Sequence, residues 1–252
     1  MQSQPSISII TVAKADPSGL VRTIKSITGV LSEEVESVIV SSGGNLVVLN
    51  ETSWPKNYCR FYEAPDAGIF DAMNKGVLYS RGKYIVFLNC GDTYNSNFRL
   101  VVDLVVCADT NADFFYGAVN FFVRPDHYYI RDAVLNQSYI SRFLSRMPIP
   151  HPALLVSRNA FDLLGLFNLK YPNTADHDWI VRLIDSGLNG RKIPFDFVTF
   201  ELGGASSQFK VVLEKFRAGL DRRQGLLSII ASVIYGFLIV LWYKLIVRIK
   251  VR

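Results

Sequence analysis

The sequence predicts an α/β protein with a mixed, mostly parallel sheet flanked by helices. In the first hundred residues, segments typical of buried strands alternate with segments of helical periodicity. This alternation indicates parallel strands joined by right-handed crossovers. The chain has 252 residues, 50% of them hydrophobic, which is enough for a sizeable core and excludes a disordered chain. We therefore expect one large domain, or one domain with an appended segment.

The first strand and the first helix have clear sequence signals. SISIITVAKA, residues 6–15, is typical of a strand. DPSGLVRTIKSITGV, residues 16–30, predicts a helix in which Asp16 is the N-cap and Pro17 is the first helical residue. The apolar face of this helix is expected to consist of Leu20, Ile24 and Ile27.

Three further strands and one more helix follow. VESVIVSSGG, residues 35–44, predicts a buried strand that ends in a glycine turn, and CRFYEA, residues 59–64, predicts a short strand. APDAGIFDAMNKG, residues 64–76, begins as a loop and continues as a helix. GKYIVFLNCGD, residues 82–92, is an apolar strand that ends abruptly in polar residues.

Polar residues gather where three of these strands end. Ligands of parallel α/β sheets bind at the carboxyl ends of the strands, although the same residue types also dominate ordinary turns. Their coincidence at three neighbouring ends favours a binding site. The residues concerned are Ser41, Ser42, Gly43, Gly44, Asp66, Gly68, Asn89, Gly91 and Asp92.

Two long motifs in this region resemble a known family. PDAGIFDAMNKG, residues 65–76, and SRGKYIVFLNCGD, residues 80–92, are similar to the inverting family-2 glycosyltransferases of bacterial cell-surface polysaccharide synthesis. The likeness is strongest to the branch of the colanic-acid and O-antigen transferases. It implies a GT-A fold over residues 1–205, with a nucleotide-sugar-binding half at 1–120 and an acceptor-binding half at 121–205.

The resemblance implies that the polar strand ends bind a nucleotide-diphosphate sugar. Asp92 matches the family's metal-binding aspartate and would hold Mg²⁺ or Mn²⁺, which neutralises the charge that develops on the leaving diphosphate. Many relatives have aspartates where this chain has Ser42, Asn89 and Gly91, so we expect weaker metal binding and leave the nucleobase open. Lys75 has the alternative of lying on a solvated helix face. The donor-site residues implied by the family are Thr11, Ser42, Asp66, Asp71, Lys75, Asn89 and Gly91.

The acceptor side is implied by HPALLVSRNAFDLLGLFNLKYPNTADHDWIVRL, residues 151–183, which resembles the family's acceptor region. Asp176 falls on the general base, which takes the proton of the attacking hydroxyl in an inverting displacement. Asp178 is the alternative base. It lies about 200° around a helix from Asp176, so only one of the two can face the acceptor. Both acids also suit a helix N-terminus for electrostatic reasons alone.

Three more residues are acceptor-side candidates by the same resemblance. His151 lies close to the active site in relatives, but a structural histidine is an equally good interpretation. Trp179 would either stack on an acceptor sugar or pack in the core, and we favour the core. Arg182 belongs to the same acidic-helix pattern.

The C-terminal part, residues 206–252, is expected to be a helical membrane-association segment. Residues 225–243 carry no charge over 19 positions, about the length that crosses a bilayer as a helix, and Trp242 and Tyr243 end the run. A buried helix and an interfacial helix are the alternatives. The small residues Ser228, Ser232 and Gly236 recur every fourth position, which favours pairing of copies into a homo-oligomer.

These observations predict an inverting, metal-dependent glycosyltransferase that moves a sugar to a hydroxyl of a lipid-linked glycan acceptor. The N-terminus has no signal-peptide pattern and the three cysteines have no paired spacing, so we expect the cytoplasmic face of the inner membrane. No nucleic-acid partner is expected. The alternatives are a catalytically weak homologue acting as an assembly subunit, or a transferase to polyisoprenyl phosphate. The latter acceptor is already ionised and would need no general base.

Overall fold

The computed structural model describes residues 4–44, 55–107, 112–124, 127–135 and 147–201, together with Glu214, Ala218, Asp221 and Ile234. The helices are α1 (Pro17–Ile27), α3 (Ile69–Tyr79), α4 (Phe98–Cys107), α6 (Arg158–Leu164) and α7 (Ala175–Asp185), with the 3-10 turns η1 (Thr28–Val30), η2 (Lys56–Tyr58) and η3 (His151–Ala153). The strands are β1 (Ile7–Ala13), β2 (Val35–Ser41), β3 (Cys59–Glu63), β4 (Tyr84–Phe87), β5 (Thr93–Tyr94), β6 (Phe114–Arg124), β7 (His127–Arg131), β8 (Leu154–Ser157) and β9 (Gly190–Glu201).

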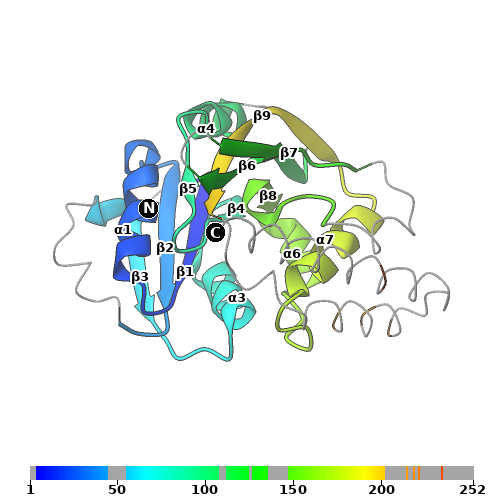
Figure 1. The fold of residues 1–252 in the computed structure, drawn as a ribbon, viewed down its shortest axis with the longest axis horizontal. Coiled ribbons are helices and arrows are strands. Elements are labelled where there is room, and N and C mark those ends of the chain that lie inside the picture. Colours follow the sequence, from blue (N-terminus) through cyan, green and yellow to red (C-terminus); the bar gives the residue numbers. More distant parts are fainter. Residues whose placement is uncertain are drawn as a thin grey trace, which may run out of the picture.

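The strands form one sheet in the order β3-β2-β1-β4-β8-β6-β9-β5, and β7 pairs with β6 outside this path (Figure 1). The first four strands of this order are parallel to one another. Strand β8 then runs antiparallel to both β4 and β6. Strand β9 pairs with β6 in parallel, and β5 pairs with β9 in the antiparallel direction. The sheet is therefore mixed, as expected, but parallel pairs do not predominate outside the N-terminal half.

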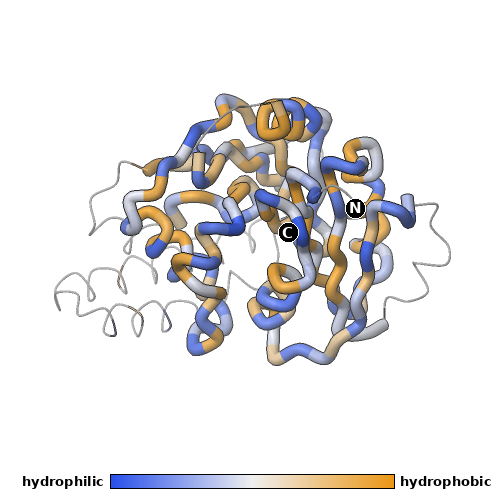
Figure 2. Tube along the Cα trace, turned by 180° about the vertical axis from the view of Figure 1, so that it is seen from behind, coloured by the Kyte–Doolittle hydropathy of each residue, from blue (hydrophilic) through white to orange (hydrophobic). Residues whose placement is uncertain are grey.

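The N-terminal elements confirm the strand and helix predictions. The Asp16 side chain accepts a hydrogen bond from the Gly19 N–H at 2.9 Å, and Pro17 begins α1. Because this N–H bonds the carboxylate, the pKa of Asp16 is lowered. Apolar and polar residues alternate along the chain (Figure 2), and helices such as α1 and α3 have one buried side.

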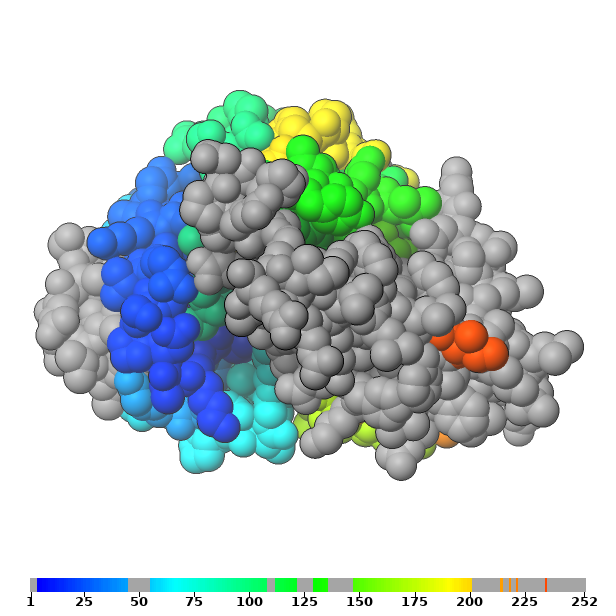
Figure 3. Space-filling view, viewed as in Figure 1, coloured from blue at the N-terminus to red at the C-terminus, as the bar shows by residue number. Residues whose placement is uncertain are grey.

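Helices cover both faces of the sheet. Alternate residues of β1 point to opposite faces, and Ile10 and Val12 pack in the cluster that includes residues of α3, α6 and α7. On the other face, Leu20 and Ile24 of α1 pack against Ala13 of β1. In the space-filling view, residues of β1, α1, β2 and α3 form one side of the molecule, and residues of α4 and β9 gather at the top (Figure 3).

Helix α3 lies very close to β1. A Cβ built on Gly76 would lie 2.4 Å from the Ile10 side chain, so a larger residue would push the helix off the sheet. This helix carries part of the stretch that resembles the family motif. Glycine at this position therefore has a packing reason.

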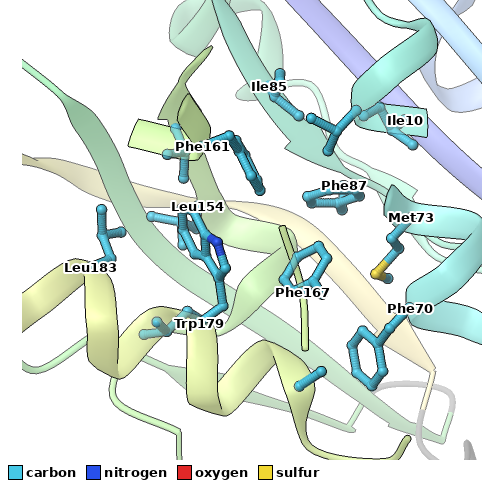
Figure 4. Close-up of a cluster of buried hydrophobic side chains, with 14 of the residues drawn as sticks. Ile10, Phe70, Met73, Ile85, Phe87, Leu154, Phe161, Phe167, Trp179 and Leu183 are labelled. Atoms are coloured by element: carbon cyan, nitrogen blue, oxygen red, sulfur yellow. The ribbon is translucent and has the colours of Figure 1, made fainter. Parts of the chain in front are cut away.

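A buried side chain joins the two halves of the fold. Asn74 of α3 donates from Nδ2 to the Phe167 carbonyl at 3.0 Å and accepts from the Phe167 N–H at 2.9 Å. The Phe167 ring packs among aromatic residues of β4, α6 and α7 (Figure 4). The loop after α6 is thus fixed to the N-terminal half by hydrogen bonds between the Asn74 side chain and the Phe167 main chain, and by packing of the Phe167 ring.

The predicted membrane segment, residues 225–243, lies outside the described residues apart from Ile234. Among the residues that the structure describes, no helix has both the length and the apolar character needed to cross a membrane. The division at residue 205, the homo-oligomer and the location at the inner membrane stay predictions.

Candidate active site

Three buried oxygens without partners lie near the carboxyl ends of neighbouring parallel strands. They are Thr11 Oγ1 in β1, Ser42 Oγ after β2 and Asn89 Oδ1 after β4, and we call this group the strand-end site. Within the described part of the chain, none of the three has a hydrogen-bond partner. The ends are held together by main-chain bonds from Ser42 N to Ala13 O and from Cys90 N to Val12 O, both 3.2 Å. Buried polar atoms are normally paired, so this grouping favours a bound ligand.

The loop after β4 is fixed by a threonine of α1 that sequence analysis did not single out. The Thr23 hydroxyl donates to the Asp92 carbonyl at 2.8 Å and accepts from the Gly91 N–H at 3.0 Å. Gly91 has φ of +98°, which favours glycine over any other residue. Its φ therefore explains why no aspartate stands here. Thr23 lies next to Ile24 on the buried face of α1, and a buried polar residue in a helix is the signal that would have found it.

Asp92 is buried, with 6% of its surface exposed. No group of three or more His, Cys, Asp or Glu residues able to hold a metal is found in the described residues. Asp92 is the one carboxylate that the family resemblance assigns to a metal, at the end of β4. This fits a hard divalent ion such as Mg²⁺ or Mn²⁺, which takes most of its ligands from water and substrate phosphates.

The loop and helix at residues 64–76 are held by their own polar side chains. Asp66 accepts from the Gly68 N–H at 3.0 Å, and Asp71 accepts from the Ala67 N–H at 2.9 Å. Lys75 donates to Asp71 at 2.8 Å and to the Pro65 carbonyl at 2.5 Å. The bond with Lys75, followed by the Ala67 N–H, lowers the pKa of Asp71. Lys75 therefore does not lie on a freely solvated face, and the three residues shape the loop beside the strand-end site.

A chain of contacts connects the strand-end site to the start of α7. Asn89 Nδ2 lies 3.1 Å from His151 Nε2, and His151 Nδ1 lies 3.4 Å from Asp176 Oδ2. The other carboxylate oxygen of Asp176 accepts from the His177 N–H at 2.8 Å. His151 comes 62 positions after Asn89 and 25 positions before Asp176. It lies in η3, which leads into β8, and β8 is the strand next to β4.

Burial favours the neutral form of His151. Burial lowers its pKa below the ordinary 6.5, and the charge of Asp176 opposes this shift only in part. A neutral imidazole with its proton on Nδ1 can donate to Asp176 and accept from Asn89 at Nε2. Because Asn89 faces the ring with Nδ2, its Oδ1 is left as an acceptor for a ligand.

Asp178 and Arg182 are engaged with each other and with the loop after α6. Arg182 Nε donates to Asp178 Oδ2 at 3.0 Å, and the same guanidinium donates to the carbonyls of Leu164 and Leu166. The two residues are four apart and share a helix face. They hold the α6–α7 loop, and their assignment to the acceptor side stays a prediction.

Trp179 is packed in the core. Its side chain is 1% exposed, its ring stacks on Phe161 with centroids 4.4 Å apart, and Nε1 donates to the Gly165 carbonyl at 2.7 Å (Figure 4). A ring enclosed in this way is not available to stack on a sugar. This placement fits the core interpretation of Trp179.

Comparisons with known proteins give the fold and its relatives. No family model matches the chain. An uncharacterized glycosyltransferase of Mycobacterium tuberculosis is 24% identical over 72% of this chain and 70% of its own length. A PGL/p-HBAD biosynthesis glycosyltransferase of Mycobacterium bovis is 30% identical over 46% of this chain and 44% of its own length.

Solved structures match over more of the chain. Residues 1–349 of Staphylococcus aureus TarS superpose with a TM-score of 0.63 at 12% identity, covering 92% of this chain and 70% of that one. The mannosyltransferase PcManGT of Pyrobaculum calidifontis, in complex with GDP-Man and Mn²⁺, gives 0.63 at 15% identity over 92% and 70%. The chain has the fold of these glycosyltransferases. The GT-A-like architecture expected from the sequence is thereby confirmed.

Proposed function

We propose that the chain is an inverting glycosyltransferase that moves a sugar from a nucleotide-diphosphate sugar to a hydroxyl of a lipid-linked glycan. The observation that carries this proposal is the contact chain Asn89–His151–Asp176, which connects a carboxylate with the strand-end site. The glycosyltransferase relatives and the shared fold support the class of reaction. Bound UDP-GlcNAc in a TarS structure and GDP-Man in PcManGT support a nucleotide-sugar donor.

The donor would occupy the strand-end site. The unpartnered oxygens of Thr11, Ser42 and Asn89 can accept hydrogen bonds from N–H or hydroxyl groups of the nucleotide sugar. Asp92 would hold a divalent ion, which supplies charge neutralisation for the leaving diphosphate when bound. The Mn²⁺ in the PcManGT complex supports this cofactor.

Asp176 would act as the general base. In an inverting displacement, the acceptor oxygen attacks the anomeric carbon opposite the leaving group, and its proton passes to a carboxylate on that side. The His177 N–H and His151 fix the two oxygens of Asp176. A base held in this way reaches the hydroxyl with little reorganisation, which increases the rate. A polyisoprenyl-phosphate acceptor is disfavoured, because an ionised phosphate needs no base.

A lipid-linked acceptor and a membrane location complete the proposal. Their support is the uncharged run at 225–243, with basic residues on both sides that would attract anionic headgroups. Membrane attachment would concentrate a lipid-linked acceptor near the site on the cytoplasmic face.

The test is release of nucleotide from UDP-, GDP- and dTDP-sugars by the purified chain with Mn²⁺. We expect one donor class to be hydrolysed or to raise the melting temperature, and Asp176→Asn to abolish turnover but keep the thermal shift. An anomeric product of retained configuration would refute the inverting mechanism. The absence of both turnover and a thermal shift with every donor would refute the proposed function.

A further inference from the structure

Three residues after the last strand contact the loop that leads into α7. Glu214, Ala218 and Asp221 are all in helical conformation. Their spacing of four and three residues is that of a single helix face. The loop they contact, Lys170–Thr174, ends two residues before Asp176.

Glu214 makes the most contacts of the three. One of its carboxylate oxygens accepts from the Asn173 N–H at 2.8 Å and from the Thr174 hydroxyl at 3.3 Å. The other accepts from the Asn173 side-chain amide. Glu214 has only 8% of its surface exposed. A buried carboxylate with these donors constrains both the main chain and the side chains of the loop.

The other two residues secure the same loop further from α7. Asp221 accepts from the Tyr171 hydroxyl at 2.7 Å and from Lys170 Nζ at 2.8 Å. Ala218, between them in sequence, is buried in the core cluster that also contains Tyr171 and Trp179. The contact thus combines hydrogen bonds with apolar packing.

Glu214 also contacts the N-cap residue of α7. Thr174 is the N-cap residue, but its side chain makes no capping hydrogen bond. Its hydroxyl donates to Glu214 instead of accepting from an N–H of the helix. A negative charge at a helix N-terminus is favourable. Glu214 therefore stabilises the N-terminus of α7, which the Thr174 side chain does not cap.

We propose that Glu214 is a positioning residue for Asp176. This inference rests on the proposed function, in which Asp176 is the base. A displacement of about 1 Å at a reacting group can cost about 100-fold in rate. Loosening the first turn of α7 would therefore slow the chemical step, while the strand-end site, at the other end of the contact chain, would still bind the donor.

The experiment compares Glu214→Ala, Glu214→Gln and the control Glu33→Ala in the full-length chain. Glu33 is an exposed glutamate in the loop before β2, at the opposite end of the parallel strands. Hydrogen–deuterium exchange is followed in peptides covering residues 171–182, and kcat and KM are measured for hydrolysis of UDP-GlcNAc and GDP-mannose.

Glu214→Ala should speed exchange at the amides of 173–178 and lower kcat about tenfold or more at an unchanged KM for the donor. Glu214→Gln keeps one acceptor oxygen and should recover part of both effects, and Glu33→Ala should match the wild type. Unchanged exchange in Glu214→Ala, or faster exchange with wild-type kcat, would overturn the inference. If the wild type turned over none of the donors in the screen, the proposed function would be refuted instead. The exchange data would then decide alone whether Glu214 orders the helix start.

Discussion

Asp176→Asn should separate catalysis from folding. The asparagine keeps an oxygen for the His177 N–H and presents an amide to His151. The His151 ring can change tautomer to accept from this amide, provided that the Asn89 amide turns its oxygen toward Nε2. We expect the free energy of unfolding to change by less than about 1 kcal/mol, because the hydrogen bonds are exchanged rather than lost. Loss of a general base lowers kcat by about 10²–10⁴, or about 2.7–5.4 kcal/mol in the activation barrier.

Asp178→Asn is the matched control, two residues further along the same helix. It removes a charge from a pair in which the Asp178 side chain is 8% exposed and that of Arg182 is 28% exposed. Arg182 keeps its bonds to the carbonyls of Leu164 and Leu166, so the loss is below that of a fully buried pair. We expect a cost of about 1–3 kcal/mol, seen as a melting temperature lower by about 3–10 °C.

The assay combines thermal unfolding with nucleotide release for the two variants and the wild type. The expected pattern is an inactive but stable Asp176→Asn and an active but less stable Asp178→Asn. If Asp178→Asn were inactive at full stability while Asp176→Asn stayed active, the assignment of the base would be wrong by two residues.

Three further outcomes are expected. Asp92→Asn should lower turnover to the level of the wild type in EDTA, and full activity of the variant in EDTA would contradict a metal role. Burial lowers the pKa of His151 below 6.5, so the unfolded chain binds more protons below that pH and stability should fall as pH decreases through this range. His151→Gln should reduce that fall in urea titrations between pH 5 and 8, and identical pH profiles would argue against it. Phe161→Ala should cost about 3–5 kcal/mol in the free energy of unfolding, since its ring packs on Trp179, Phe87 and Phe167; a loss below about 1 kcal/mol would contradict this packing.

The N-terminal half was predictable because its signals are local. Periodicity, the Asp16 cap and the glycine turn each concern a few consecutive residues, and the structure places β1, α1, β2, β3, α3 and β4 where these signals indicated. The antiparallel insertion of β8 between β4 and β6 was not predicted. It depends on pairing between strands far apart in sequence, which no local pattern encodes.

The contacts among the candidate residues were predictable only in part. The Asp71–Lys75 and Asp178–Arg182 pairs have the four-residue spacing of helical ion pairs, a signal present in the sequence that would have indicated their structural role. The contact of His151 with Asn89 and the bonds of Glu214 to residues 173 and 174 have no such signal. Both join segments that only the folded chain brings together.

The bridge from Asn74 to Phe167 has a consequence for how such chains can diversify. Asn74 bonds only main-chain atoms of residue 167, through one donor and one acceptor. Any residue at 167 with an N–H offers the same two partners, so the hydrogen bonds do not restrict which side chain stands there. Exchange of the segment after α6 between related proteins would preserve this junction wherever the asparagine is kept and an apolar residue fills the space of the Phe167 ring. Under the proposed function, such an exchange would replace acceptor-side residues and leave the donor-side residues of the N-terminal half unchanged.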